Sequence, residues 1–537
     1  MIRRICIQII FLIFVSCNEE STLSNDSSEV VDGMDLEKID EEILIEGECI
    51  NNLQCSNENP CDGEEKCIHG ICSPGTPPDC DDNDPCTQDY CSLEIGWCVH
   101  KPLDSDDDGY IAMEAPDNSN CGGNDCDDGD SETYPGALEK CDEKDNDCDG
   151  EIHDDIYVLK ESINISSASG LSFSPSLVLT DDGYAIAWDD NRDGAEQEEI
   201  YFARFSKDGM KIGDDLRVTN SDGYSMGCSL AFTGSEFGIA WSDEREHLGD
   251  FELYFTRISQ EGIKIGDDIK VTNVPGGEYE LSPSLIFTGS EFAVSWNDSH
   301  EGNLEIYFSK ISMDGNAIGE ITRVSDFPHN SALSSLVFSG SEFGIAWVDF
   351  RDSESNGEIY FCRLAIDGTK IGNEIRVSDL PYRSTYPSLV FTGSEYGVVW
   401  HDYRNDVSFS DIYFAKMSLD GIKIGTDHRI TFGDFDSQSS SRYAKLTFSG
   451  SEFGVSWTQV FPYGEEARFD NYFTRISLDG ERIGENVLLK SDRGIIELFS
   501  CTSLLFDGDD YVIAWEDYRN FNMNNIDIYI NFIGCKL

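Results

Sequence analysis

The sequence predicts an all-β protein: a seven-bladed β-propeller of four-stranded blades, preceded by small disulfide-rich and Asp-rich calcium-loop modules. Two repeated features predict the propeller. Six units contain an Asp-Gly or Glu-Gly pair after an apolar run, which favours a tight hairpin turn. Tryptophan recurs every 51 to 58 residues, a period typical of stacked or radially arranged units. The repeated residues are Trp188, Trp241, Trp296, Trp347, Trp400, Trp457 and Trp515.

Each unit divides into four expected strands. The first ends at a Gly-Ser tip, and the second is an apolar run that ends in the tryptophan, as in residues 237–241. The third strand precedes the Asp-Gly turn, as in residues 358–361, and the fourth follows it, as in residues 269–272. The first three strands are almost continuously apolar, which indicates that both faces of each sheet are covered. Blades that pack on neighbours on both sides meet this requirement.

The two ends of the repeat array predict a closed ring. The last unit has three expected strands, residues 503–506, 512–515 and 526–532, and no fourth strand before Leu537. Residues 159–166, just before the first unit, have the pattern of a fourth strand. We therefore expect this segment to complete the last blade and to remove an exposed sheet edge. The propeller is assigned to residues 156–537.

The N-terminal segment predicts export. Residues 1–17 contain Arg3 and Arg4, an apolar stretch too short to remain as a membrane span, and Cys17. This pattern resembles a bacterial lipoprotein signal, which implies lipidation of Cys17 and a place in the bacterial cell envelope, at the outer membrane or cell surface. An ordinary secretory signal, giving a secreted protein, is the alternative. Residues 18–48 carry 12 carboxylates and one lysine and are expected to form a disordered tether.

Cysteine is concentrated ahead of the propeller. Thirteen of the 19 cysteines lie between Cys49 and Cys148, a density typical of an oxidising compartment. Residues 49–100 contain no Cys-x-x-Cys pair, which argues against a zinc ribbon and favours a small disulfide-stapled module. Because thirteen is odd, at least one of these cysteines is unpaired or pairs elsewhere. The connectivity is left open.

Residues 101–155 carry 20 carboxylates and three lysines, arranged as in calcium loops. Aspartates at positions 1, 3 and 5, glycine at 6 and a backbone carbonyl at 7 form the first half of such a loop, and residues 125–130 form a shortened variant. Position 12 holds Ala115 or Ile156, so the remaining ligands are expected from Glu114 or Asp117 and from Asp154 or Asp155. The predicted metal ligands are Asp104, Asp106, Asp108, Tyr110, Asp125, Asp127, Asp130, Asp145, Asp147, Asp149, Glu151 and Asp155.

This acidic segment resembles a known family. Residues 104–155 are similar to the Asp- and Cys-rich metal-binding motif of exported bacterial surface proteins, sometimes named after the copper-binding surface protein MopE. The resemblance implies metal binding, but carboxylate and carbonyl oxygens suit calcium rather than copper. We expect a structural Ca²⁺ site with the motif's cysteines in disulfides; an acidic spacer without metal is the alternative. The matching residues include Asp125, Cys126, Asp127, Asp128, Asp130, Cys141, Asp145, Asp147, Cys148, Asp149 and Asp155.

A polar signature, Trp-x-Asp-x-Arg, recurs in five propeller units. It predicts either a ligand-binding ring at one mouth of the channel or an ion pair that closes the loop after the second strand in every blade. Its repetition favours the structural interpretation. Departures from a repeat are better candidates for function, and residues 461–466, expected to be a long loop in the sixth unit, are the candidate ligand contact.

The function predicted from these features is surface binding or adhesion rather than catalysis. The net charge of −67 excludes nucleic acid as a partner, because phosphates would be repelled. The expected partners are a membrane, through the lipid anchor, and a glycan, an envelope polymer or a protein. No catalytic residue is assigned. A sialidase-like propeller glycoside hydrolase and a structural envelope protein without a discrete ligand are the alternatives; the turn at residues 312–315 resembles the sialidase Asp-box only distantly.

Overall fold

The computed structural model describes two compact units, which divide between Pro102 and Leu103. The described residues are 49–535 except 57–58, 138–143, 149, 151–155, 195–197, 248, 273–281, 301, 380–381, 432–438, 464–465, 495–501 and 520–524. The predicted lipidation site Cys17 and the tether at 18–48 lie outside them. Within the described chain, no helix has the length and apolar character required to cross a membrane.

The first unit consists of two short hairpins held by disulfides. A 3₁₀ helix, η1 (Asn52–Gln54), precedes β1 (Lys66–Ile68), which pairs with β2 (Ile71–Ser73), and β3 (Thr87–Ser92) pairs with β4 (Trp97–Pro102). Such small sheets cannot bury a sufficient apolar core, so covalent links replace it. The predicted disulfide-rich region is therefore confirmed. The bridges include Cys49–Cys67, Cys55–Cys72, Cys61–Cys91 and Cys80–Cys98.

The second unit contains the seven-bladed propeller, as predicted, and every blade is an antiparallel sheet. Blade 1 contains β7 (Ser172–Thr180), β8 (Gly183–Asp190), β9 (Glu199–Ser206) and β10 (Lys211–Arg217); blade 2 contains β11 (Ser225–Phe232), β12 (Glu236–His247), β13 (Asp250–Ser259) and β14 (Lys264–Lys270). Blade 3 contains β15 (Ser284–Phe287), β16 (Phe292–Asp298), β17 (Glu305–Ile311) and β18 (Ala317–Arg323); blade 4 contains β19 (Ser331–Phe338), β20 (Glu342–Asp349), β21 (Glu358–Ala365) and β22 (Lys370–Arg376).

The remaining blades follow the same order. Blade 5 contains β23 (Ser384–Phe391), β24 (Glu395–Asp402), β25 (Asp411–Ser418) and β26 (Lys423–Arg429); blade 6 contains β27 (Ser440–Phe448), β28 (Phe453–Tyr463), β29 (Glu466–Ile476) and β30 (Arg482–Gly494). Blade 7 contains β31 (Thr502–Phe506), β32 (Tyr511–Asp517) and β33 (Asp527–Cys535). The first strands of successive blades contact one another in an unbroken ring, so they surround the central axis.

The apolar core lies between the blades. One cluster joins Tyr184 and Trp188 of blade 1 to Val512 and Ile530 of blade 7, and the next joins blade 1 to blade 2. All seven repeated tryptophans are at most 1% exposed. Each tryptophan ring lies about 6 Å from the ring of a tyrosine on the third strand, as in Trp241 and Tyr254 at 6.0 Å. The tryptophans therefore anchor the blades and are not available to a ligand.

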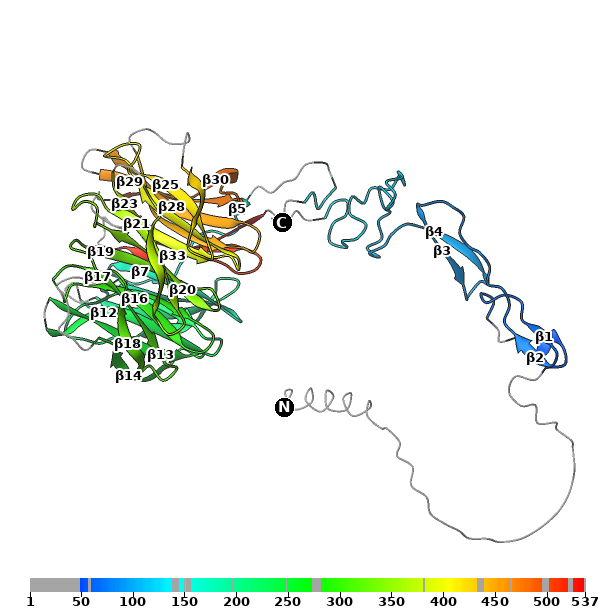
Figure 1. Cartoon of the computed structure of the whole chain (residues 1–537), viewed down its shortest axis with the longest axis horizontal. Coiled ribbons are helices and arrows are strands. Elements are labelled where there is room, and N and C mark those ends of the chain that lie inside the picture. Colours follow the sequence, from blue (N-terminus) through cyan, green and yellow to red (C-terminus); the bar gives the residue numbers. More distant parts are fainter. Residues whose placement is uncertain are drawn as a thin grey trace, which may run out of the picture. The chain divides into compact units, whose positions relative to one another are not determined.

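The ring closes as predicted, through the segment that precedes blade 1. β5 (Ile156–Val158) and β6 (Ile163–Asn164) both pair with β33, with Ile533 opposite Val158 and Tyr529 opposite Asn164. Figure 1 draws β33, in red, beside β7 of the first blade, which it contacts. The pairing starts at Ile156, before the predicted strand at 159–166, and is interrupted around Lys160, whose carbonyl accepts a hydrogen bond from the Asn531 side chain at 3.3 Å.

The expected loop in blade 6 is instead the end of a long hairpin. β28 and β29 remain in register as far as Tyr463 opposite Glu466, and only residues 464–465 between them lie outside the described chain. Phe461 pairs with Arg468, whose guanidinium lies 3.9 Å from the Phe461 ring centroid. Val460 and Phe461 on one strand and Phe469 on the other are residue types that favour strands, and they extend the ladder. The prediction of a loop at 461–466 was therefore wrong.

Candidate metal centre and channel-facing residues

The first Asp loop gathers three carboxylates. Asp104, Asp106 and Asp108 each place an oxygen within 4.8 Å of the other two. Asp107 and Gly109, with φ of 62° and 97°, curl the chain around them. Backbone N–H groups fix the carboxylates: Asp108 N donates to Asp106 Oδ1 at 3.2 Å and Tyr110 N donates to Asp108 Oδ1 at 2.8 Å. The first three predicted ligands are thus brought together.

A fourth carboxylate, Asp125, joins this loop from the next part of the chain. Met113 N donates to Asp125 O at 2.7 Å, and Asp125 N donates to Ile111 O at 3.1 Å. Gly123 permits this close approach, because a Cβ there would lie 2.0 Å from the Ile111 carbonyl oxygen. The Asp125 side chain is only 1% exposed. The backbone therefore holds a buried carboxylate against the loop.

The electrostatics of this cluster favour a bound cation. Burial raises the pKa of Asp125, and the neighbouring charges of Asp108, Asp106 and Asp128 raise it further. Burial likewise raises the pKa of Asp106. The Oδ2 atoms of Asp106, Asp108 and Asp125 are buried and, among the described groups, meet no hydrogen-bond donor. Buried acceptors without donors are costly, and a hard divalent cation that prefers oxygen ligands would satisfy them.

The source of the completing ligand differs from the expectation. Glu114 is exposed and belongs to an isolated bridge with Asn120, while Asp117 Oδ1 accepts a hydrogen bond from Ser119 N at 2.9 Å. Asp125 lies near enough to the loop for the charges of Asp106 and Asp108 to raise its pKa. Asp128, which was not among the predicted ligands, binds the same loop by accepting hydrogen bonds from Ser105 N and Oγ at 2.9 and 2.7 Å. The Asp-Cys-Asp-Asp run at 125–128 was the available signal.

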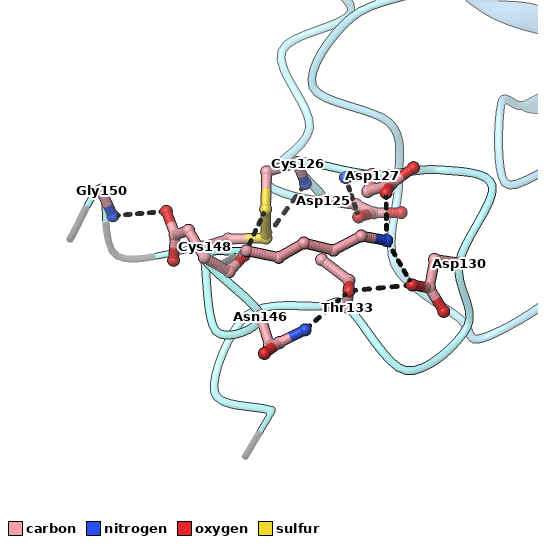
Figure 2. Close-up of a disulfide and its surroundings, with 10 residues drawn as sticks. Asp125, Cys126, Asp127, Asp130, Thr133, Asn146, Cys148 and Gly150 are labelled. Carbon is pink, nitrogen blue, oxygen red and sulfur yellow. Dashed lines mark hydrogen bonds and ion pairs between the residues drawn. A yellow bond between two sulfur atoms is a disulfide. The ribbon is translucent and has the colours of Figure 1, made fainter. Parts of the chain in front are cut away.

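The rest of the shortened loop does not join this cluster. Asp127 and Asp130 bind the ammonium group of Lys144 at 3.2 and 2.8 Å, and these contacts raise the pKa of the lysine. Figure 2 shows Asp127 and Asp130 on the same side of the Cys126–Cys148 disulfide, with Asn146 below them. A lysine therefore supplies the positive charge at these two predicted metal ligands.

The third predicted loop is described only in part. Asp145 Oδ2 accepts a hydrogen bond from Gly150 N at 2.9 Å, which closes the loop as its glycine position requires. Predicted ligands Asp149, Glu151 and Asp155 lie outside the described residues. Tyr110, whose carbonyl was a predicted ligand, stacks its ring on Tyr134 at 5.0 Å and so ties the first loop to the second.

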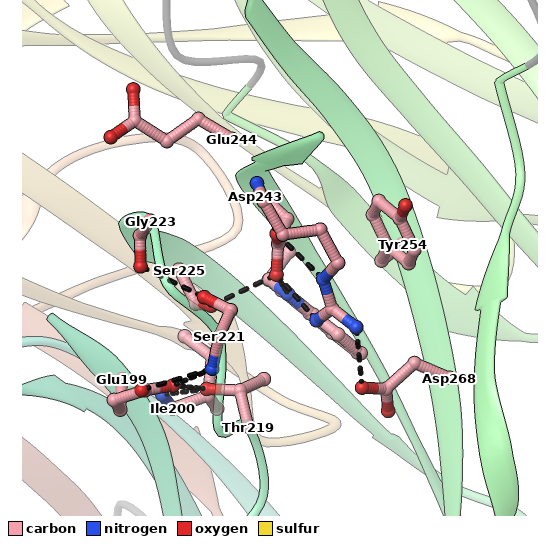
Figure 3. Close-up of polar contacts among 12 residues, drawn as sticks. Glu199, Ile200, Thr219, Ser221, Gly223, Ser225, Asp243, Glu244, Tyr254 and Asp268 are labelled. Carbon is pink, nitrogen blue, oxygen red and sulfur yellow. Dashed lines mark hydrogen bonds and ion pairs between the residues drawn. The ribbon is translucent and has the colours of Figure 1, made fainter. Parts of the chain in front are cut away.

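The repeated propeller signature is structural. In blade 2, Asp243 Oδ2 accepts hydrogen bonds from Trp241 Nε1 at 2.8 Å, Ser225 Oγ at 2.9 Å and Arg245 Nη2 at 2.6 Å. Arg245 also binds Asp268 at 3.0 Å (Figure 3). Burial raises the pKa of Asp243, but the bonds from Arg245 and Trp241 outweigh it and leave that pKa lowered. The same arginine–aspartate contact occurs at Arg192–Asp190, Arg351–Asp349, Arg404–Asp402 and Arg519–Asp517.

A second contact, missed from the sequence, joins four of the blades to the next one, where the residue after the tryptophan is Asp189, Asn297, His401 or Glu516. The residue after the tryptophan accepts a hydrogen bond from a backbone N–H in the first strand of the following blade. Each donor residue has φ between 52° and 65°. The signal was available, because this residue is polar in six of the seven units. The contacts are Asp189–Gly227 at 2.8 Å, Asn297–Leu333 at 3.3 Å, His401–Tyr443 at 3.3 Å and Glu516–Ser174 at 2.8 Å.

His401 departs most from the other residues at this position. It is 3% exposed, and its ring stacks on Tyr386 at 5.3 Å and meets the edge of Tyr403 at 6.0 Å. Burial lowers its pKa well below the ordinary value of 6.5, and the charges of Arg442 and Arg383 lower it further. The ring is therefore neutral, and because Nδ1 accepts the Tyr443 N–H, Nε2 carries the proton.

The buried neutral histidine should make stability depend on pH. As pH falls below about 6.5, His401 binds a proton in the unfolded chain but stays neutral in the folded protein. The free energy of unfolding therefore falls by up to ~1.4 kcal/mol per pH unit. We expect His401→Gln, which keeps an acceptor but does not titrate, to remove this part of the slope. Urea unfolding at pH 7.5, 6.5 and 5.5 measures it. Equal slopes for both proteins would contradict the assignment.

Comparisons with known proteins match two short segments. Residues 125–154 match a family described as "Putative metal-binding motif", which carries the MopE name, and residues 79–103 match a family described as "Dictyostelium (slime mold) repeat". The second match was not foreseen; it covers the hairpin of β3 and β4. Protein psiR of Dictyostelium discoideum is 34% identical over 64 residues, which are 11% of this chain and 6% of that protein. The chain thus matches only a small part of that relative's length.

Solved structures similar to this chain include a sialidase and an α-L-arabinofuranosidase. A sialidase from Trypanosoma rangeli in complex with sialic acid is 10% identical, with 57% of this chain and 56% of that chain covered and a TM-score of 0.37. An α-L-arabinofuranosidase from Lactobacillus brevis is 11% identical, with 52% and 98% covered and a TM-score of 0.32. Similarity at this level carries no argument about activity.

Proposed function

We propose that this chain is a lipid-anchored surface-binding protein of the bacterial cell envelope, in which an Asp-rich segment holds Ca²⁺ and the propeller binds a glycan, an envelope polymer or a protein. The lipoprotein-like pattern ending at Cys17 and the disulfides of the first unit support export. The observation that carries the metal assignment is the clustering of Asp104, Asp106 and Asp108, with the buried Asp125 near enough for its pKa to respond to Asp106 and Asp108.

The ligand chemistry favours calcium over copper. The cluster offers carboxylate oxygens, which suit calcium, whereas copper prefers imidazole or thiolate. Cys126 and Cys148 of the same motif form a disulfide and present no thiolate. Asp104, Asp106, Asp108 and Asp125 would hold the ion, and Asp128 would keep the loop in place through Ser105. The bound ion would supply the positive charge that these crowded carboxylates require.

Calcium should stabilise the acidic segment through Asp125. At a concentration 100-fold above its dissociation constant, Ca²⁺ is expected to add about 2.7 kcal/mol to the free energy of opening that segment. Calorimetric titration of the full chain should show Ca²⁺ binding that Asp125→Asn weakens at least tenfold. Asp117→Asn, a change at an exposed carboxylate, is the matched control. Wild-type binding by Asp125→Asn, or tighter binding of Cu²⁺ than Ca²⁺, would overturn the assignment.

The binding role of the propeller is tested on glycan and envelope-polymer arrays with the full chain. A propeller hydrolase would need a carboxylate pair around the scissile bond. Two described carboxylates directly follow a repeated tryptophan, Asp189 and Glu516. Each accepts a hydrogen bond from a backbone N–H of the next blade, which is a structural role rather than a catalytic one. Retention of an array member without cleavage would support binding. Cleavage of a bound glycoside would favour the hydrolase. Absence of binding to any compound on the arrays would contradict the proposed ligand classes.

A further inference from the structure

Two arginines near His401 are unlike the paired arginines of the blade signature. Arg404 in the same blade binds Asp402 and Asp427 at 2.6 and 2.8 Å. Within the described structure, by contrast, Arg383 and Arg442 have no carboxylate partner. Arg442 Nε, like Arg404 Nε, is buried without a hydrogen-bond acceptor. The chain has 104 acidic side chains and 37 lysines and arginines, so acidic partners are abundant. Two guanidinium groups with no acidic partner among the described residues therefore call for an explanation.

Both arginines lie on the channel side of blades 5 and 6. Arg442 belongs to β27, the first strand of blade 6, and directly precedes Tyr443, the residue that donates to His401. Arg383 directly precedes β23, the first strand of blade 5, and its carbonyl accepts a hydrogen bond from Tyr403 N at 2.9 Å. Both guanidinium charges act on the His401 ring, so all three groups share one neighbourhood.

The repeat shows that the fold does not require a positive charge at Arg442. Arg442 lies opposite Thr458, the residue that follows Trp457. In other blades, the first-strand residue opposite the one that follows the tryptophan is the equivalent of Arg442. The equivalent residues in other blades are uncharged: Phe173, Met226, Ala332 and Thr385. A buried guanidinium atom without an acceptor is destabilising. A charged residue at a position where the other blades have uncharged ones is a candidate for binding.

The groups around the two arginines are donors and aromatic faces. Tyr386 and Tyr443 are partly exposed, and their rings meet edge to face at 4.9 Å. His401 presents the Nε2 proton because its Nδ1 is already an acceptor. We name Arg383, Tyr386, His401, Arg442 and Tyr443 the Arg383–Arg442 cluster. Its chemistry suits a ligand that brings acceptors, negative charge and a ring.

We propose that the Arg383–Arg442 cluster binds the carboxylate of an acidic sugar, a hexuronate, at the channel side of blades 5 and 6. Guanidinium forks match carboxylates in two parallel hydrogen bonds, and the tyrosine faces offer apolar surface to the sugar ring. The chain's net charge of −67 would repel a densely charged polyanion but admits a single carboxylate at a local positive site. This inference rests on the proposed binding function of the propeller and names its ligand class.

The test uses the full chain, with glucuronate as the probe and glucose as its neutral match. Calorimetric titration should show glucuronate binding at least tenfold tighter than glucose. Arg442→Gln and Arg383→Gln should each weaken it at least tenfold, and Lys207→Gln, which removes an exposed charge in blade 1, should leave it unchanged. Arg383 is exposed, so its substitution tests the site without disturbing the core.

The outcomes separate this inference from the broader function. Undetectable glucuronate binding, or unchanged binding by Arg383→Gln, overturns the cluster as a sugar-acid site. Acetate or inorganic phosphate bound as tightly as glucuronate overturns the sugar and leaves a simple anion site. If the arrays retain neutral glycans while glucuronate fails, only this inference falls. If neither the arrays nor glucuronate gives binding, the proposed propeller function falls with it.

Discussion

Removal of residues 1–166 is expected to lower the free energy of unfolding of the propeller by on the order of 5 kcal/mol. This truncation deletes β5 and β6, which complete the last blade by pairing with β33. It also removes Ile165, which is fully buried, together with Leu159 and Ile163, which pack on the same cluster. Removal of residues 1–155 leaves these strands in place and should change propeller stability by less than about 1 kcal/mol.

The two truncations form a matched pair for urea unfolding and light scattering. Loss of β5 and β6 exposes the N–H and C=O groups of β33, an edge that promotes pairing between molecules. The shorter protein should therefore self-associate as well as unfold earlier. Equal midpoints and equal molar masses for the two truncations would show that the ring does not depend on its N-terminal strands.

Arg245→Met is expected to destabilise the propeller by about 3–5 kcal/mol, because it leaves the buried charge of Asp243 without its partner. Asp243 is 1% exposed, and Arg245 also binds Asp268 and lies 4.3 Å from the Tyr254 ring centroid. Neutralising the stranded charge should recover part of the loss. The double variant Arg245→Met with Asp243→Asn is therefore expected to be about 1–2 kcal/mol more stable than Arg245→Met alone.

Denaturant unfolding of the single and double variants measures this coupling. Lys207→Met, at an exposed lysine of a blade 1 turn, is the control for loss of a cation and should stay within about 0.5 kcal/mol of wild type. A loss below about 1 kcal/mol for Arg245→Met would show that the ion pair contributes little. A double variant no more stable than the single one would show that packing on Tyr254 matters more than the charge.

The propeller could be predicted because its signals repeat. Trp241 and its six counterparts, the Asp-Gly turns and the missing fourth strand of the last unit each depend on local pattern, and seven copies reinforce one another. The ends of strands were less accessible. The segment at 461–466 contains proline and glycine and so predicts a loop, yet Phe461 and Arg468 extend the hairpin because their side chains pack across it. Contacts between strands decide such boundaries.

The sequence predicted the three aspartates of the first metal loop, but not which residues from other loops lie beside them. The spacing of Asp104, Asp106 and Asp108 is local, so it indicates convergence directly. Asp125 is held near them by backbone bonds around Ala112, and the pairing of Lys144 with Asp127 depends equally on how distant loops dock. The spacing of aspartates along the sequence does not predict such contacts between separate loops. The contacts between blades at Asp189 and Glu516 were missed because their acceptors and donors belong to different units.

The closing strands also determine where mechanical load enters the propeller. Any tension on the N-terminal part of the chain reaches the ring at Ile156, the first residue of β5, and passes first to the pairs formed with β33. Next in the load path are the contacts at Ile163 and Asn164 and the hydrogen bond from Ile528 N to Ser166 Oγ at 3.0 Å. Blade 7, which joins the two ends of the propeller, should therefore open first under such a force. The other blades should bear the force only after the strand pairs of blade 7 have separated.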